Sequence, residues 1–164
     1  MEKLLETLKN NDYRLFQIMG SEQLEIIADT DLDSAQEGYR FNPIKNEVIA
    51  DWGTIVGDEY YVVGFNSMLG DPILVDTSKE NLPVYNMFSD KWESRFPVAT
   101  SFDELISNLK KLDEMINIKK EPRETIKKFA VDLDEKIHSA GFYEALCFDI
   151  LDEEGLHYED YQPK

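Results

Sequence analysis

The spacing of apolar residues changes along the chain, and each change marks a predicted element. Near the start, leucines at helical spacing predict a short amphipathic helix over 1–11. A capping box followed by apolar residues three and four apart predicts a longer helix over 101–116. Pro122 suits the first position of another helix, which we expect Gly141 to close, and residues 142–150 read as a further short helix.

Between residues 47 and 87 the apolar residues form short runs rich in β-branched and aromatic types, as is typical of strands. Residues 24–28 resemble a short strand too, whereas 13–19 is compatible with a helical turn or a strand. Turn residues separate the runs, and the gaps are too short for parallel crossovers, so the pattern predicts an antiparallel meander. We therefore predict a single α+β domain. The four runs are 48–50, 60–65, 73–75 and 84–87.

Charge narrows the class of partner. The chain has 34 acidic and 17 basic residues among 164, a formal net charge of −17. A surface of this sign repels phosphate backbones and anionic lipids, which argues against nucleic acid or membrane partners. It attracts basic proteins, although acidity that serves solubility alone is the other interpretation.

The single cysteine and the charged opening segment indicate a reducing compartment. Cys147 has no second cysteine with which to form an internal disulfide, and the first ten residues lack the apolar run of a signal peptide. The longest apolar stretch, 60–65, is far shorter than the roughly 20 residues that span a bilayer. We expect a soluble cytoplasmic protein, either a monomer or a homodimer.

Motifs for catalysis or cofactor binding are missing from the sequence. It contains no phosphate-binding glycine loop, no G-x-S-x-G and no H-E-x-x-H. The acidic stretch 29–33 begins like a calcium loop, but Ser34 and Arg40 occupy positions that need glycine and glutamate. We predict no enzyme activity, cofactor or metal, while a small hydrolase using a carboxylate pair remains a minor alternative.

Cys147 and His138 suggest a nucleophile and base, but Cys147 shares a predicted helical face with apolar neighbours. A cysteine in such surroundings is usually inert packing. We therefore expect a core thiol.

Five short motifs occur in an order that resembles the SUKH superfamily, which groups a fungal cell-wall regulator with many bacterial immunity proteins. The resemblance covers about a third of the chain. The sequence departs from the family in its opening region and in its tail after Lys119. The motifs are Trp52-Gly53, Gly70-Asp71-Pro72-Ile73-Leu74-Val75-Asp76, Leu82-Pro83-Val84-Tyr85, Trp92 and Ala99-Thr100-Ser101-Phe102-Asp103-Glu104-Leu105.

The resemblance implies a curved antiparallel sheet of about four to six strands with helices packed against it. Residues 119–164 would then form a C-terminal helical extension of a single domain. It further implies an immunity protein that binds and neutralises a cognate toxin, often a nuclease, by stoichiometric occlusion. The main alternative is a non-enzymatic adaptor that binds an endogenous protein.

Seven residues are candidates for contact with a basic partner because they combine acidic or aromatic side chains with predicted turns and strand ends. Two alternatives stay open. The tryptophans are also suited to covering the edge of the core, and Asp71 and Asp76 to structural roles in turns. The candidates are Asp51, Trp52, Asp58, Glu59, Asp71, Asp76 and Trp92.

Overall fold

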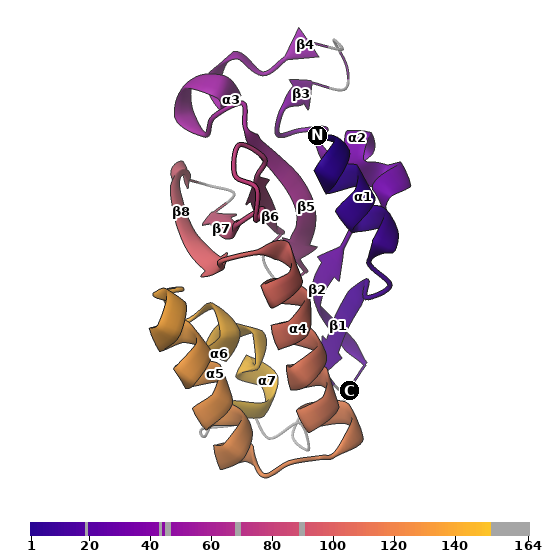
Figure 1. Cartoon of the computed structure of the whole chain (residues 1–164). Coiled ribbons are helices and arrows are strands. Elements are labelled where there is room, and N and C mark those ends of the chain that lie inside the picture. The colour runs from indigo at the N-terminus through magenta and orange to yellow at the C-terminus, as the bar shows by residue number, and fades with distance from the viewer. Residues whose placement is uncertain (19, 43, 45–46, 68–69, 89–90, 152–164) are drawn as a thin grey trace, which may run out of the picture.

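The computed structural model describes residues 1–151 apart from 19, 43, 45–46, 68–69 and 89–90; the side chains of 50, 91–93 and 149 are likewise outside the description. Its centre is a six-stranded sheet in the order β1-β2-β5-β6-β7-β8, with every neighbouring pair antiparallel (Figure 1). The predicted α+β class and meander are confirmed. The strands are β1 (Leu15–Ile18), β2 (Ser21–Ile26), β5 (Tyr60–Asn66), β6 (Asp71–Asp76), β7 (Val84–Phe88) and β8 (Lys91–Ala99).

β6 is buried along its whole length, which explains its continuous apolar sequence. The side chains of Ile73, Leu74 and Val75 are 0% exposed. The neighbouring strand β5 carries a bulge near Gly64, and a Cβ on this glycine would overlap the backbone oxygen of Glu25 on β2. Glycine therefore permits the close approach of β2 to β5 at this position.

The longer helices lie against the sheet and beyond one end of it. α4 follows β8 in the chain and contacts both β8 and the opposite outer strand, β1. In Figure 1 the C-terminal helices α5, α6 and α7 lie at one end of the molecule, opposite β3, β4 and α3. The helices are α1 (Glu2–Asn10), α4 (Phe102–Asp113), the π-helix η2 (Glu114–Ile118), α5 (Arg123–Ile137), α6 (Phe142–Leu146) and α7 (Phe148–Leu151).

The predicted capping box begins α4. The Ser101 hydroxyl accepts the Glu104 N–H at 3.1 Å, and the Glu104 carboxylate accepts the Thr100 N–H at 2.7 Å. These bonds satisfy donors that the first turn leaves unpaired. The prediction of this helix from local signals is confirmed.

The α5–α6 junction depends on a buried carboxylate. Asp134 is 7% exposed and accepts the backbone N–H groups of Tyr143 and Glu144, each at 2.9 Å. α5 ends before His138, which adopts a left-handed conformation, and Gly141 precedes α6. The prediction that Gly141 closes the preceding helix was therefore wrong by three residues, because His138 takes the left-handed cap.

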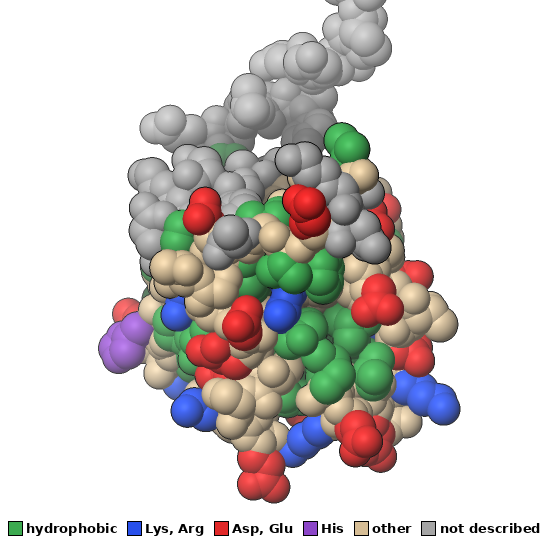
Figure 2. Space-filling model, turned by 90° about the horizontal axis from the view of Figure 1, so that it is seen from above, with side chains coloured by type: hydrophobic (Ala, Val, Ile, Leu, Met, Phe, Trp, Pro, Cys, Tyr) green, Lys and Arg blue, Asp and Glu red, His purple; other side chains and the backbone are tan. Residues whose placement is uncertain are grey.

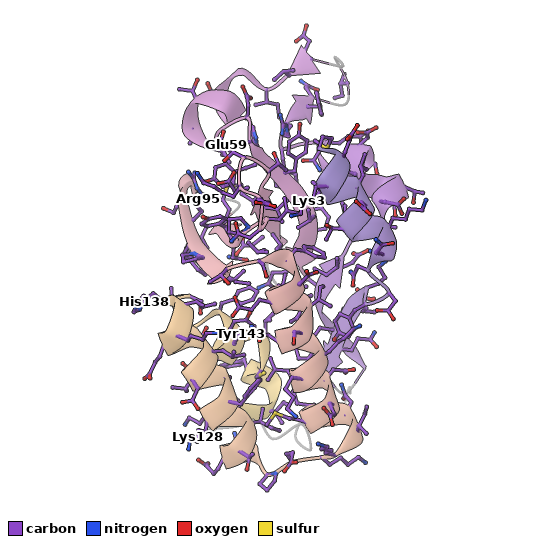
Figure 3. The ribbon with its side chains drawn as sticks, in the orientation of Figure 1. Lys3, Glu59, Arg95, Lys128, His138 and Tyr143 are labelled. Carbon is purple, nitrogen blue, oxygen red and sulfur yellow. The ribbon has the colours of Figure 1, made fainter. Side chains whose placement is uncertain are left out.

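Tyr143 ties the C-terminal helices to the rest of the fold (Figure 3). Its buried hydroxyl donates to the Val98 oxygen of β8 at 2.8 Å and accepts from the Asn108 amide of α4 at 3.1 Å. Side chains from α1 through α7 belong to one buried hydrophobic cluster. The helices after Lys119 thus share the core of the sheet.

The segment between β2 and β5 forms a small unit at the end opposite the C-terminal helices. Val48 to Ala50 was predicted as a strand, but only Val48 is in one and Ala50 begins α3. Trp52 and Val56, four residues apart, bury the inner side of α3, so tertiary packing outweighs the β-branched composition. The unit contains η1 (Asp29–Asp31), α2 (Leu32–Ala35), β3 (Phe41–Asn42), β4 (Glu47–Val48) and α3 (Ala50–Ile55).

No helix in the described part of the chain is long and apolar enough to cross a membrane.

Candidate functional site

Three of the seven candidate residues are exposed at the same end of the molecule. Asp51 lies in the first turn of α3, and Asp58 and Glu59 lie in the connection from α3 to β5. All three are exposed, and within the described residues no ion pair involves any of them. The structure thus places these carboxylates on α3 and its connection to β5 and leaves them open to solvent.

Trp52 is a core residue. It is 1% exposed and packs edge-to-face on Tyr39, with ring centroids 6.3 Å apart. Such burial excludes direct contact with a partner in this conformation, so its assignment to the binding surface is corrected in favour of the core-edge alternative. Tyr39 in turn packs on Phe65 of β5, with ring centroids 6.1 Å apart, so these rings link α3 to the sheet.

Asp71 and Asp76 are also buried, each 4% exposed, at the two ends of β6. The Asp76 carboxylate accepts the backbone N–H of Ser78 at 2.8 Å and the Ser78 hydroxyl at 2.5 Å. This is the structural turn role left open for Asp76 by the sequence. Both residues are therefore removed from the candidate surface.

Trp92 lies in β8 by its backbone, and its side chain is outside the described part of the structure. The sequence placed it beside an irregular segment, whereas β8 runs from Lys91 to Ala99. Its candidacy stays a prediction.

Three apolar side chains of the same segment are also exposed. Ile44 in the β3–β4 turn is 93% exposed, Val48 on β4 is 64% exposed and Ile55 on α3 is 40% exposed. Figure 2 looks at this end from above and shows hydrophobic side chains in the centre of the face, with Asp and Glu and several Lys and Arg side chains around them. We call this surface the hairpin end and define it by Ile44, Val48, Asp51, Ile55, Asp58 and Glu59.

Two glycines let carboxylates lie against the backbone of α3 and its connection. A Cβ on Gly53 would come within 2.9 Å of the Asp58 carboxylate, and one on Gly57 within 2.8 Å of the Glu59 carboxylate. Gly57 also has a φ of +109°, which side chains rarely adopt. The C-terminal end of a helix disfavours nearby negative charge, so a cation supplied from outside would relieve this arrangement.

Arg40 fixes the connection that carries Asp58 and Glu59. Its guanidinium donates to the backbone oxygens of Asp58 and Tyr60, both at 3.0 Å, and lies 3.9 Å from the centre of the Tyr61 ring. The Arg40 guanidinium thus binds two backbone carbonyls and one aromatic ring. It therefore orders the hairpin end, and it forms no ion pair with a carboxylate in the part of the chain that the structure describes.

Other candidate chemistry in the described residues is weak. Cys147 is buried, and burial raises the pKa of its thiol to about 12, so the expected core thiol is confirmed. His138 is exposed at the end of α5. In the part of the chain that the structure describes, no three His, Cys, Asp or Glu side chains are grouped to hold a metal ion.

Sequence reasoning missed the apolar half of the hairpin end. Val48 was assigned to a predicted strand. Single exposed apolar residues are common on protein surfaces, so composition gives no signal for them. One signal was available at Ile44, which stands alone between Pro43 and the polar pair Lys45-Asn46. An apolar residue within such turn chemistry indicates an exposed tip.

Comparisons of the chain with protein-family models, with curated proteins and with solved structures give no match.

Proposed function

We propose that this chain is an immunity protein that binds a basic toxin domain through the hairpin end and blocks it by occlusion. The observation that carries the proposal is the cluster of exposed Asp51, Asp58 and Glu59, which have no ion pair within the described residues. The assignment of the partner as a toxin rests on the resemblance to the SUKH superfamily.

The combination of charge and apolar surface suits protein recognition. Carboxylates accelerate the encounter with a basic partner, while apolar side chains supply the area removed from water on binding. Ile44 and Val48 expose most of their surface in the free protein, so their burial stabilises a complex. Charge therefore contributes mainly to rate and specificity, and apolar contact contributes mainly to lifetime.

A nuclease toxin is the partner class that agrees best with the charge. A nuclease domain needs basic residues to bind phosphates, and a chain of net charge −17 complements such a surface. Occlusion needs no bond chemistry from this chain. The bound chain alone would block access of nucleic acid to the nuclease.

The alternative is an adaptor that binds an endogenous protein, and the exposed Ile44, Val48 and Ile55 favour it if the apolar contact dominates. The two functions differ in salt response. Capture driven by the carboxylates weakens steeply as salt rises, whereas apolar capture changes little.

The test is affinity capture from the source cell with the complete chain and two charge variants. The hairpin variant carries Asp51→Asn, Asp58→Asn and Glu59→Gln. The control variant carries Glu124→Gln, Asp132→Asn and Glu135→Gln, which remove the same charge from exposed positions on α5. We expect a basic protein whose lethality is relieved by co-production, with at least about tenfold weaker binding for the hairpin variant alone.

Equal weakening by both variants would show that net charge acts without a defined surface. Capture of no basic or harmful protein would reject the immunity function.

A further inference from the structure

Arg95 on β8 is half-buried, and its contact among the described residues is with an aromatic ring. Within the described residues its guanidinium forms no hydrogen bond or ion pair, although the chain contains 34 acidic residues. Arg14 and Arg40 differ from it, because their guanidinium groups donate to backbone oxygens at 2.6–3.0 Å. No Arg95 nitrogen is among the buried unpaired polar atoms of the described residues, so its N–H groups reach solvent and are available to an external acceptor.

The Arg95 guanidinium stacks on Tyr60, and Tyr85 packs on Tyr60 in turn. Its central carbon lies 4.3 Å from the centre of the Tyr60 ring, and Tyr60 packs edge-to-face on Tyr85 with centroids 5.6 Å apart. Stacking covers one flat side of a guanidinium and leaves the N–H groups at its edge available. Arg95 is thereby oriented before any partner binds.

Tyr85 lies near enough to Arg95 for the two groups to interact electrostatically. Burial raises the pKa of Tyr85 above its usual value, Tyr60 and Asp76 raise it further, and the charge of Arg95 opposes the rise. The phenol therefore stays protonated at neutral pH and is able to donate a hydrogen bond.

Arg95 lies close to the hairpin end. Glu59, an exposed carboxylate of the hairpin end, directly precedes Tyr60, on whose ring Arg95 stacks. Figure 3 shows Glu59 and Arg95 in the same half of the molecule, away from His138 and Lys128 on the C-terminal helices. A partner that covers the hairpin end can therefore reach Arg95 as well.

We propose that Arg95 and Tyr85 bind a carboxylate side chain of the partner protein, an inference that rests on the proposed function. A planar guanidinium edge matches a carboxylate through two parallel hydrogen bonds. The net charge of −17 repels polyanions, so the acceptor is an isolated carboxylate flanked by the basic residues that pair with Asp58 and Glu59. The interface then alternates in sign, which fixes the register of the partner.

The first test uses acetate as the probe and needs no partner. The Nε–H signals of the arginines are followed by NMR in the complete protein during titration with sodium acetate, with chloride and phosphate titrations at equal ionic strength. Arg95→Lys assigns the signal. We expect a saturable shift at Arg95 at several-fold lower acetate concentration than any shift at Arg14 or Arg40, and a further two- to tenfold weakening in Tyr85→Phe.

Equal responses of the three arginines, or equal effects of chloride and acetate, would reject the site. A stronger response to phosphate would reassign it to phosphoryl groups and overturn the carboxylate proposal.

The second test uses the captured partner and separates this inference from the proposed function. Arg95→Ala is expected to weaken binding about tenfold or more, in line with arginine hot spots. If Arg95→Ala binds normally while the hairpin variant does not, the proposed function stands and this inference fails. If Arg95 recognises acetate but no partner is captured, the carboxylate site stands and the proposed function fails.

Discussion

At the two ends of the molecule, charged side chains have different surroundings. On the helical side, Lys136 on α5 pairs with Glu104 at 2.6 Å, and Lys119 pairs with Glu114 at 2.8 Å. At the hairpin end, Asp58 and Glu59 have no ion pair within the described residues. Lys119 and Lys136 thus pair with carboxylates of the helices, whereas Asp58 and Glu59 are unpaired in the described part of the chain and share their segment with exposed apolar side chains. Four predictions test this comparison.

Removing the buried support of the hairpin end has the largest expected effect. Trp52→Ala should lower the free energy of unfolding by about 3–5 kcal/mol, because it leaves a large cavity under α3. Urea unfolding measures the change, and Trp52→Phe should cost clearly less. The neighbouring Asp51→Asn is the surface control and should stay within about 0.5 kcal/mol. A loss below about 1 kcal/mol for Trp52→Ala would contradict its core role.

Acid should weaken the helical side through Glu104. Burial acts to raise the pKa of Glu104, but hydrogen bonds from Lys136 and Thr100 outweigh it and lower the pKa to about 2. A carboxyl whose pKa is lower in the folded state adds stability above its unfolded pKa of 4.5 and loses it as the pH falls toward about 2. Stability should fall by on the order of 2–3 kcal/mol across this window from Glu104 alone.

Glu104→Gln is the matched control for the acid effect. Between pH 6 and pH 2, the free energy of unfolding should fall by that much less in the variant than in the original chain. Identical pH slopes in the two proteins would show that Glu104 is not stabilised by its partners.

A side chain at Gly57 should disturb the hairpin end moderately. Gly57→Ala meets both the Glu59 carboxylate and an unfavourable φ of +109°, and should cost about 1–2 kcal/mol in unfolding experiments. Gly38→Ala is the control, because Gly38 has a φ of +81° with no atom within 4 Å of a new Cβ. The excess cost at Gly57 measures the carboxylate contact, and equal costs would mean that the Glu59 side chain simply moves away.

Neutralising the hairpin carboxylates should have the smallest effect on stability. The variant with Asp51→Asn, Asp58→Asn and Glu59→Gln should have a free energy of unfolding within about 0.5 kcal/mol of that of the original chain. Exposed unpaired charges contribute little to stability. Thermal and urea unfolding provide the measurement. A loss above about 1 kcal/mol would show that these carboxylates serve the fold.

Local signals predicted the elements that local forces determine. The capping box at Ser101 fixed the start of α4, and the apolar runs around Ile73 and Val84 identified β6 and β7. α3 was hidden because Ile49 looks like a strand residue, while its N–H binds the Arg40 oxygen at 2.7 Å in the folded chain. β8 was missed because its sequence lacks clear alternation and contains Pro97, which an edge strand tolerates.

For the candidate site, the sequence predicted charge better than position. Exposed Asp58 and Glu59 agree with the predicted acidic surface, but nothing local distinguishes them from buried Asp71 and Asp76. Burial depends on which strands meet, and that information is distant in sequence. The stacking of Arg95 on Tyr60 was missed for the same reason, because it depends on where β8 lies relative to β5.

The buried amide of Gln36, which directly precedes segment 37–59, binds the backbone of Val62 on β5, shortly after that segment ends. It donates to the Val62 oxygen at 2.8 Å and accepts the Val62 N–H at 3.0 Å, where β2 no longer pairs with β5. Residues 37–59 are therefore closed at their base, and the whole connection from β2 returns to β5 beside its starting point, where the Ile27 N–H binds the Val63 oxygen at 3.0 Å. A segment closed at its base in this way can change in length and sequence while the sheet stays the same. The proposed recognition surface can thus vary on a constant scaffold.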